Sequence, residues 1–348
     1  MHSQIYYVGL DVHKRSVSFC VKLADGTVVQ DGEVKATRAA LAEWAEKLPR
    51  PWVGALEATL FSHWIYYWLQ NFASEMRMGH PARMKAIASG KKKNDRVDAA
   101  MITDLLRCNL FPAIQVLPES YVAMRQVLGY RNLLVRSHVQ MKNKIAGLLM
   151  EAGVEYEKQK LHGGRYFGQL LKNRPEISAS VRPLLTFSRS QMETVQRMER
   201  QLAGQLSTRP ELTDRLQRLT RIPGVGPITA LTWVLEVGPI ERLATISKAV
   251  SYCGLTSAQR SSAGVDKRGP LSKQRNRFLQ VGLIEAAKIA PRWNPLLKQL
   301  HERELTRGNK NRATLAVARK LVAYLWAADR GHQPAALLRQ PTATTAAG

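Results

Sequence analysis

The N-terminal part of the chain alternates short apolar runs with stretches of helical spacing. The run IYYVGLDV has no helical period and is rich in β-branched and aromatic residues, which predicts a strand buried on both faces. The Asp25-Gly26 pair is typical of a hairpin turn and favours an antiparallel meander. Three strands followed by alternating helices and strands predict an α/β layer with a mixed sheet. The predicted elements are strands 5–12, 16–23 and 27–34, helix 37–48, strand 52–57, helix 60–71 and a short strand at 76–79.

The middle of the chain changes to long helical periods. A helix is predicted from Glu119 to Gly153, and a second over 184–206. Two such helices form either an antiparallel hairpin or a coiled coil between subunits, and ordinary core packing is the other interpretation. The first helix carries an apolar seam with a seven-residue repeat, made by Leu134, His138, Met141, Ile145 and Leu148.

A third pattern begins near Glu211, where short helices surround the sequence IPGVGPITA. This sequence is typical of a helix-hairpin-helix turn, in which Gly224 and Gly226 let backbone amides approach a phosphate. The alternative is a Pro-Gly loop between two packed helices. The predicted fold class is therefore α/β plus all-α. Its parts are a mixed-sheet domain at 1–115, a long-helix linker at 116–210, a mainly helical domain at 211–331 and a disordered tail at 332–348.

The charge of the chain points to a polyanionic partner. Its 348 residues include 52 Lys and Arg but 27 Asp and Glu, which gives a formal charge of +25 and a pI near 10.3. Nucleic acid is the expected partner, and a membrane surface is the weaker alternative. No apolar run is long enough to span a bilayer, and no signal peptide is discernible. Three widely spaced cysteines predict neither disulfides nor a zinc site and fit a reducing cytoplasm.

Four acidic residues stand out against this basic background. Asp11 lies inside a predicted buried strand, where a carboxylate is costly unless its charge is compensated. Glu57 lies near the end of the strand WVGALEA. Asp95 and Asp98 share one face of a predicted helix over 95–107, and like charges placed there repel unless a cation bridges them. The alternatives are a strand end for Glu57 and solvated positions near a helix N-terminus for the aspartate pair.

Serine and basic side chains supply the remaining candidate chemistry. Ser261 and Ser262 are expected in a polar, glycine-flanked loop, where a hydroxyl needs activation before it can act as a nucleophile. Neither a Ser-His-Asp pattern nor Gly-x-Ser-x-Gly occurs. The cations expected to contact nucleic acid lie in the loop before the aspartate helix and around the serines, and they are Lys91, Lys92, Lys93, Arg260, Lys267, Arg268 and Lys273.

These motifs, taken in order, resemble the DEDD-type transposases of bridge-RNA-guided bacterial insertion sequences. GLDVHK, ALEAT and NDRVDAAMI match the acidic motifs of that family at Asp11, Glu57, Asp95 and Asp98. IPGVGPITA and YCGLTSAQRSSAG match its C-terminal domain, and an ungapped alignment places the family's serine on Ser262. Two departures are visible: Ala263 stands where the family has glycine, which leaves Ser261 as the alternative, and the family's Lys-x-Gly-Asn is Lys273-Gln274-Arg275-Asn276 here.

The resemblance implies a RuvC-like, ribonuclease-H-like domain and a DNA recombinase. It also implies a bacterial cytoplasmic protein associated with the nucleoid. The four acids would bind two magnesium ions at the scissile phosphate, and the serine would attack it. A structured guide RNA would pair with donor and target DNA, and dimers would pair into a tetramer, with the serine of one subunit meeting the acids of another. Two alternatives remain. A Holliday-junction resolvase would use the same acids with water as nucleophile, whereas a binding protein would leave the acids unexplained.

Overall fold

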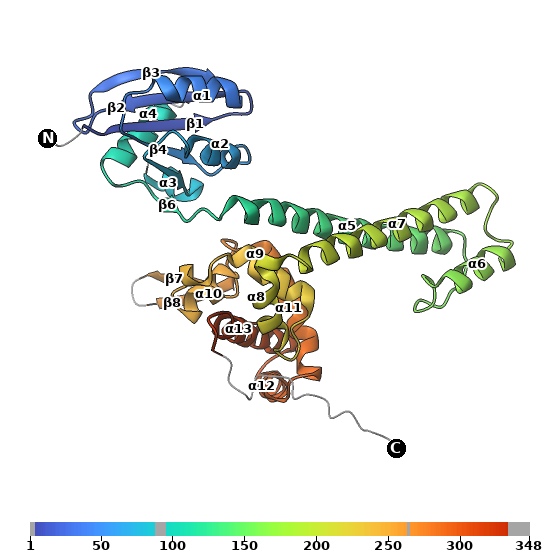
Figure 1. Cartoon of the computed structure of the whole chain (residues 1–348). Helices are drawn as coiled ribbons and strands as arrows, with labels where there is room; N and C mark the ends of the chain where they lie inside the picture. The colour runs from blue at the N-terminus through green and yellow to red at the C-terminus, as the bar shows by residue number, and fades with distance from the viewer. Residues whose placement is uncertain (1–3, 88–94, 263–264, 333–348) are drawn as a thin grey trace. The chain divides into compact units, whose positions relative to one another are not determined.

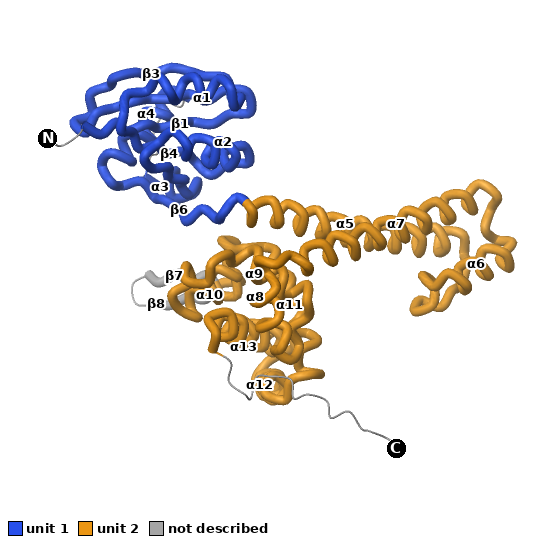
Figure 2. Tube along the Cα trace, in the orientation of Figure 1, with its two compact units in different colours: residues 1–119 blue, residues 120–348 orange. Residues whose placement is uncertain are grey.

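The computed structural model describes residues 4–87, 95–262 and 265–332, with the backbone alone at 258–262 and 265–268 (Figure 1). The chain divides into two compact units, residues 1–119 and 120–348 (Figure 2). The predicted boundary between linker and C-terminal domain near residue 210 falls inside the second unit and stays a prediction. Of the predicted tail, His332 is described, and the remainder lies outside the described residues.

The first unit is built on a six-stranded mixed sheet in the order β3-β2-β1-β4-β5-β6. The strand β1 (Tyr6–Val12) pairs antiparallel with β2 (Ser16–Lys22), which pairs antiparallel with β3 (Val28–Lys35). On its other side β1 pairs parallel with β4 (Trp52–Glu57). The predicted meander and mixed sheet are therefore confirmed.

The far half of this sheet contains one strand that the sequence pattern did not reveal. The strand β5 (Glu75–Gly79) pairs parallel with β4, as the mixed sheet requires. The two-residue strand β6 (Ala113–Ile114) then pairs antiparallel with β5. A strand this short has too few residues to show an alternating pattern, so its pairing depends on tertiary structure.

Helices cover both faces of the sheet. On one face, α1 (Arg38–Lys47) and α2 (Ser62–Leu69) bury Trp44 and Ile65 against Leu10 and Leu56. On the other face lie α3 (Pro81–Ile87), which was not predicted, and α4 (Asp95–Arg107). Side chains alternate along a strand, so neighbouring residues of β1 contact different helices.

The second unit begins with the long helix α5 (Glu119–Glu151), followed by α6 (Gly164–Asn173) and α7 (Val181–Ser207). The helices α5 and α7 run side by side (Figure 1), and Ile145 and Leu148 of the predicted seam are buried in one cluster with Met192 of α7. These helices thus pack within one chain at this point. The structure does not test whether they also form a coiled coil between subunits.

The remainder of the second unit is mainly helical, as predicted, with one hairpin. Its elements are α8 (Pro210–Thr220), α9 (Pro227–Val237), η1 (Ile240–Arg242), α10 (Ile246–Tyr252), β7 (Ser257–Ser262), β8 (Val265–Leu271), α11 (Arg277–Ile289), η2 (Ala290–Arg292), α12 (Pro295–Thr306) and α13 (Lys310–Asp329). None of the described helices is long and apolar enough to cross a membrane. All three cysteines are free thiols.

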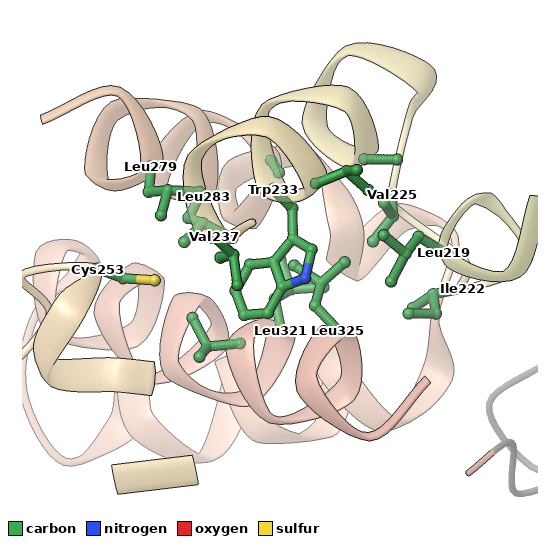
Figure 3. Packing of buried hydrophobic residues seen from close by; sticks show 14 of the residues in the cluster. Leu219, Ile222, Val225, Trp233, Val237, Cys253, Leu279, Leu283, Leu321 and Leu325 are labelled. Atoms are coloured by element: carbon green, nitrogen blue, oxygen red, sulfur yellow. The ribbon is translucent and has the colours of Figure 1, made fainter. Parts of the chain in front are cut away.

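One buried ion pair lies in the core of this helical part. Trp233 of α9 is fully buried between Leu321 and Leu325 of α13 (Figure 3). Its indole N–H donates to Asp329, 2.9 Å away, and Asp329 also accepts two hydrogen bonds from Arg215 at 2.6 and 2.8 Å. The Asp329 side chain is fully buried, so its charge depends on these donors.

Arg215→Met is expected to lower the free energy of unfolding by about 3–5 kcal/mol, because it leaves the buried Asp329 carboxylate uncompensated. Arg312→Met breaks an ion pair with Glu304 in which the arginine side chain is 56% exposed. It should therefore lower the free energy of unfolding by less than about 1 kcal/mol. Urea denaturation measures both values. A double variant, Arg215→Met with Asp329→Leu, should be more stable than Arg215→Met alone, and the opposite order would contradict this account.

Candidate active site

Asp11 lies on the face of the sheet that α4 covers. Along β1, Leu10 and Val12 belong to the cluster beneath α1 and α2. Because successive side chains point to opposite faces, Gly9 and Asp11 face α4. The Asp11 side chain is only 17% exposed, in agreement with the prediction that this carboxylate lies inside a strand.

The position of α4 depends on Gly9. A Cβ atom at Gly9 would overlap the carbonyl oxygen of Ala99 and the amide nitrogen of Thr103, so the backbone of α4 lies directly on β1. Thr103 also donates a hydrogen bond to the Cys20 carbonyl at 3.0 Å. This contact brings the first turn of α4, with Asp95 and Asp98, to the end of β1 that carries Asp11.

His13 joins the acids and was missed as a site residue. Its Nε2 lies 3.1 Å from Asp11 Oδ2 and 3.3 Å from Asp95 Oδ2. In the described part of the chain, these three side chains form a group whose ligand atoms lie within 4.8 Å of one another. The only sequence signal was the histidine in GLDVHK, which has no ligand spacing of its own.

The electrostatics at Asp11 are those of a carboxylate crowded by other acids. Burial raises the pKa of Asp11, the adjacent His13 lowers it, and the charges of Asp98 and Asp95 raise it further. The net direction is upward, so the folded protein disfavours the ionised form that a metal ligand requires. Asp98 is thus within electrostatic reach of Asp11, although it is not part of the closest group.

Strand register places Glu57 beside this group. Leu10 of β1 pairs with Leu56 of β4, so Asp11 and Glu57 are the next residues on adjacent parallel strands. Leu56 belongs to the cluster under α1 and α2, and Glu57 therefore faces α4, as Asp11 does. The four predicted acids consequently lie at one end of one sheet face. Their donor set of carboxylate oxygens suits a hard divalent cation such as magnesium.

Ser261 and Ser262 lie in regular structure, which corrects the expectation of an irregular loop. Both belong to β7, where Ser261 pairs with Asp266 and Ser262 with Val265 of β8. Cross-strand pairing stabilises this conformation, and the polar sequence concealed it. Arg260 pairs with Lys267, and Gln259 with Arg268, so the predicted cations are backbone neighbours of the serines.

A buried carboxylate that sequence reasoning missed joins α5 to the residue that caps α11. Glu236 of α9 accepts hydrogen bonds from Arg125 of α5 at 2.8 Å and from the Asn276 side chain at 2.6 Å. Asn276 also caps α11 by accepting from Leu279. Arg275, where the related family has glycine, is not among the described residues with positive φ, so no glycine is needed there.

The two glycines of the IPGVGPITA turn have different roles. Gly224 has φ +93°, and a Cβ atom there would overlap Ala290, so it serves packing as well as the turn. Gly226 is exposed, with nothing near its missing Cβ, and it is the N-cap of α9 without a side-chain hydrogen bond. Phosphate binding by this turn stays a prediction. Lys273 is exposed after β8, whereas Lys91, Lys92 and Lys93 lie outside the described residues.

Asp11→Asn is expected to raise the melting temperature at pH 7 in the absence of divalent ions. Because the folded-state pKa of Asp11 is raised, its favourable contribution is present below the unfolded pKa and is lost as pH rises through the folded one. Asparagine cannot ionise, so the variant avoids this loss of stability at pH 7. The gain in melting temperature should vanish in strong acid, where Asp11 is protonated. Calorimetry with and without magnesium measures the effect.

Magnesium should stabilise the wild-type protein more than Asp11→Asn. Asp31→Asn, which changes an exposed carboxylate on β3, is the matched control and should respond to magnesium as the wild type does. Equal magnesium shifts in Asp11→Asn and wild type would exclude Asp11 as a ligand.

Comparison with known proteins gives the family. Residues 8–153 match the model of the DEDD transposases of the IS110 group, described as "Transposase". Residues 216–302 match a second model, "Transposase IS116/IS110/IS902 family". The two regions together cover two thirds of the chain and include all four acids and both glycines of the IPGVGPITA turn.

Three relatives of this chain are also named as transposases. The "Probable family 20 transposase" of Pseudomonas aeruginosa is 24% identical, over 83% of this chain and 87% of the relative. The transposase for insertion sequence element IS1111A of Coxiella burnetii is 26% identical, over 75% and 74%. The transposase for insertion sequence element IS1328 of Yersinia enterocolitica is 22% identical, over 92% and 95%.

The DEDD model implies a ribonuclease-H-like fold, and the mixed sheet with helices on both faces agrees with it. The four acids lie on β1, β4 and the helix α4 against them. On these grounds the chain belongs to the DEDD-type insertion-sequence transposases of the IS110 family, and it is a DNA recombinase.

Proposed function

We propose that this transposase cuts and rejoins DNA with two magnesium ions, which are bound by Asp11, Glu57, Asp95 and Asp98. The observation that carries the proposal is the contact of α4 with β1 at Gly9, which gathers these acids on one face of the sheet. Membership of the DEDD family supports divalent-metal dependence. When bound, such ions stabilise the attacking and leaving oxygens of phosphoryl transfer.

The residues of the chain have distinct tasks in this proposal. The carboxylates of Asp11 and Asp95 share the His13 ring nitrogen, which holds both side chains in one arrangement before DNA arrives. His13 is therefore a positioning residue. Glu57 and Asp98 complete the acidic face from the neighbouring strand and from the same first turn of α4.

We further propose that Ser262 is the nucleophile. Its Oγ would form an ester with the scissile phosphate as the bond to the leaving strand oxygen breaks, and the proton would pass to a carboxylate of the acidic face. The serine hairpin belongs to the second compact unit and the acids to the first. This division supports the proposal that one subunit supplies the serine and another supplies the acids. Assembly as dimers that pair into a tetramer meets that requirement.

In a trapping experiment with nicked DNA, wild-type protein should carry a phosphoserine link on Ser262, located by peptide mass spectrometry. Ser262→Ala and Asp98→Ala should each lower strand cleavage by at least ~10³-fold, the scale seen when a principal catalytic group is removed. Both variants should retain DNA binding. Ser257→Ala, at the other end of β7, is the matched control and should cleave normally.

The outcomes of trapping separate the alternatives. A link on Ser261 would move the nucleophile by one residue. Cleavage by Ser262→Ala in magnesium without any link would establish a resolvase-like reaction with water as nucleophile. Normal cleavage by Asp98→Ala would end the metal-site proposal while leaving the family assignment intact.

A structured RNA from the element itself is proposed as the guide. The charge of +25 suits a second polyanion besides DNA, and the resemblance to RNA-guided transposases supports the same partner. RNA transcribed from the flank of the gene should compete with a labelled copy of itself at least about tenfold better than length-matched random RNA. Equal competition at physiological salt would remove the guide RNA and leave the DNA-recombinase function standing.

A further inference from the structure

A groove of about 610 Å³ lies in the second unit, beside the α8–α9 turn. It is formed by one side of α5, the start of α9, the outer face of α11 and Trp293. Its volume is within the range of small-ligand sites. Its lining includes three arginines and two aromatic residues, namely Arg131, Arg136, Arg277, Phe278 and Trp293.

The outer face of α11 presents apolar surface that the protein itself does not bury. Its inner face places Leu279 and Leu283 in the core (Figure 3). On the groove side, Phe278 is 41% exposed and Trp293, just beyond the helix, is 65% exposed. Two large aromatic side chains that line one groove and remain exposed are a platform for a flat ligand.

The charge in the groove is positive. Arg136 and Arg277 are exposed, and neither lies within 4 Å of a carboxylate among the residues whose side chains the structure describes. Glu285 is the acid in the lining, and its charge is compensated by Lys288 at 2.6 Å. Arg131 is held by Glu199, yet its buried Nε has no partner in the described part of the chain.

We propose that this groove binds an unpaired nucleotide of the DNA substrate. The base stacks on Phe278 and Trp293, and the flanking phosphates contact Arg136 and Arg277. This inference rests on the recombinase function, because strand exchange opens base pairs and leaves bases without partners. Among possible occupants, DNA fits best, because arginines line the same groove as the aromatic pair and Lys288 compensates the acid in the lining. A protein helix would use the apolar surface but not the cations.

The test compares a duplex that contains one bulged thymidine with the fully paired duplex of the same sequence, by fluorescence anisotropy with full-length protein. Wild type should prefer the bulged duplex by between about fivefold and about a hundredfold, the range for stacking one base on aromatic side chains. Trp293→Ala combined with Phe278→Ala should abolish that preference while binding to the paired duplex persists. Trp293→Tyr, which keeps an aromatic face, should retain most of it.

Phe187→Ala is the matched control, because Phe187 is 63% exposed on α7 and does not line the groove. It should keep the wild-type preference, and a loss there equal to that of the double variant would overturn the proposal.

Arg136→Ala with Arg277→Ala should weaken binding of both duplexes. The slope of log affinity against log salt should become shallower by about 0.9 for each phosphate that the protein no longer neutralises. A 5-iodouracil at the bulge should crosslink to Trp293 or Phe278 on irradiation.

The remaining outcomes separate this site from the function on which it rests. Binding of both duplexes with equal affinity by wild type would remove the nucleotide site and leave the recombinase intact. Binding of neither duplex at any salt concentration would contradict DNA recombination itself. Stronger competition by the same bulge in RNA would overturn the assignment to DNA. A lower molecular mass of the double variant in solution would show that the groove is an interface between copies of this chain.

Discussion

The absence of a side chain at Gly9 is the constraint on which the arrangement of the acids in the first unit depends. The backbone of α4 lies on β1 at this residue, and any Cβ atom there would overlap Ala99 and Thr103. If α4 moved outward by the width of a methyl group, Asp95 could not share the His13 nitrogen with Asp11 at 3.1 and 3.3 Å. Close packing between a helix and a central strand thus determines the geometry of charged groups two residues further along the strand.

The same geometry places repulsion inside a folded protein. Burial and two neighbouring aspartates oppose the ionisation of Asp11, and one histidine offsets part of that effect. Proteins tolerate such repulsion where a bound ligand compensates the charge. Ligand binding then relieves the repulsion and stabilises the folded protein. In a chain with a charge of +25, a concentration of acids on one sheet face is specific to this site and is not a consequence of composition.

Local pattern predicted most of the elements, because strands such as β1 and helices such as α5 carry their own periodicity. It singled out Asp11, since a carboxylate inside a strand conflicts with its surroundings, whereas Asp95 and Asp98 were selected by their spacing on one helix face and by the resemblance. It did not reveal β6, His13 as a site residue or Glu236 as a support, because each depends on residues distant in sequence. The serine strand was hidden for a related reason: a polar hairpin is stabilised by cross-strand pairing, which a single segment cannot show.

Glu236 connects the long helix α5 with the start of α11 in the helical unit. It accepts hydrogen bonds from Arg125 of α5 and from Asn276, the residue that caps α11. Asn276 follows the serine hairpin and directly precedes the helix that carries Phe278 into the groove. A single buried carboxylate therefore ties the long helix α5 to the start of the groove helix α11.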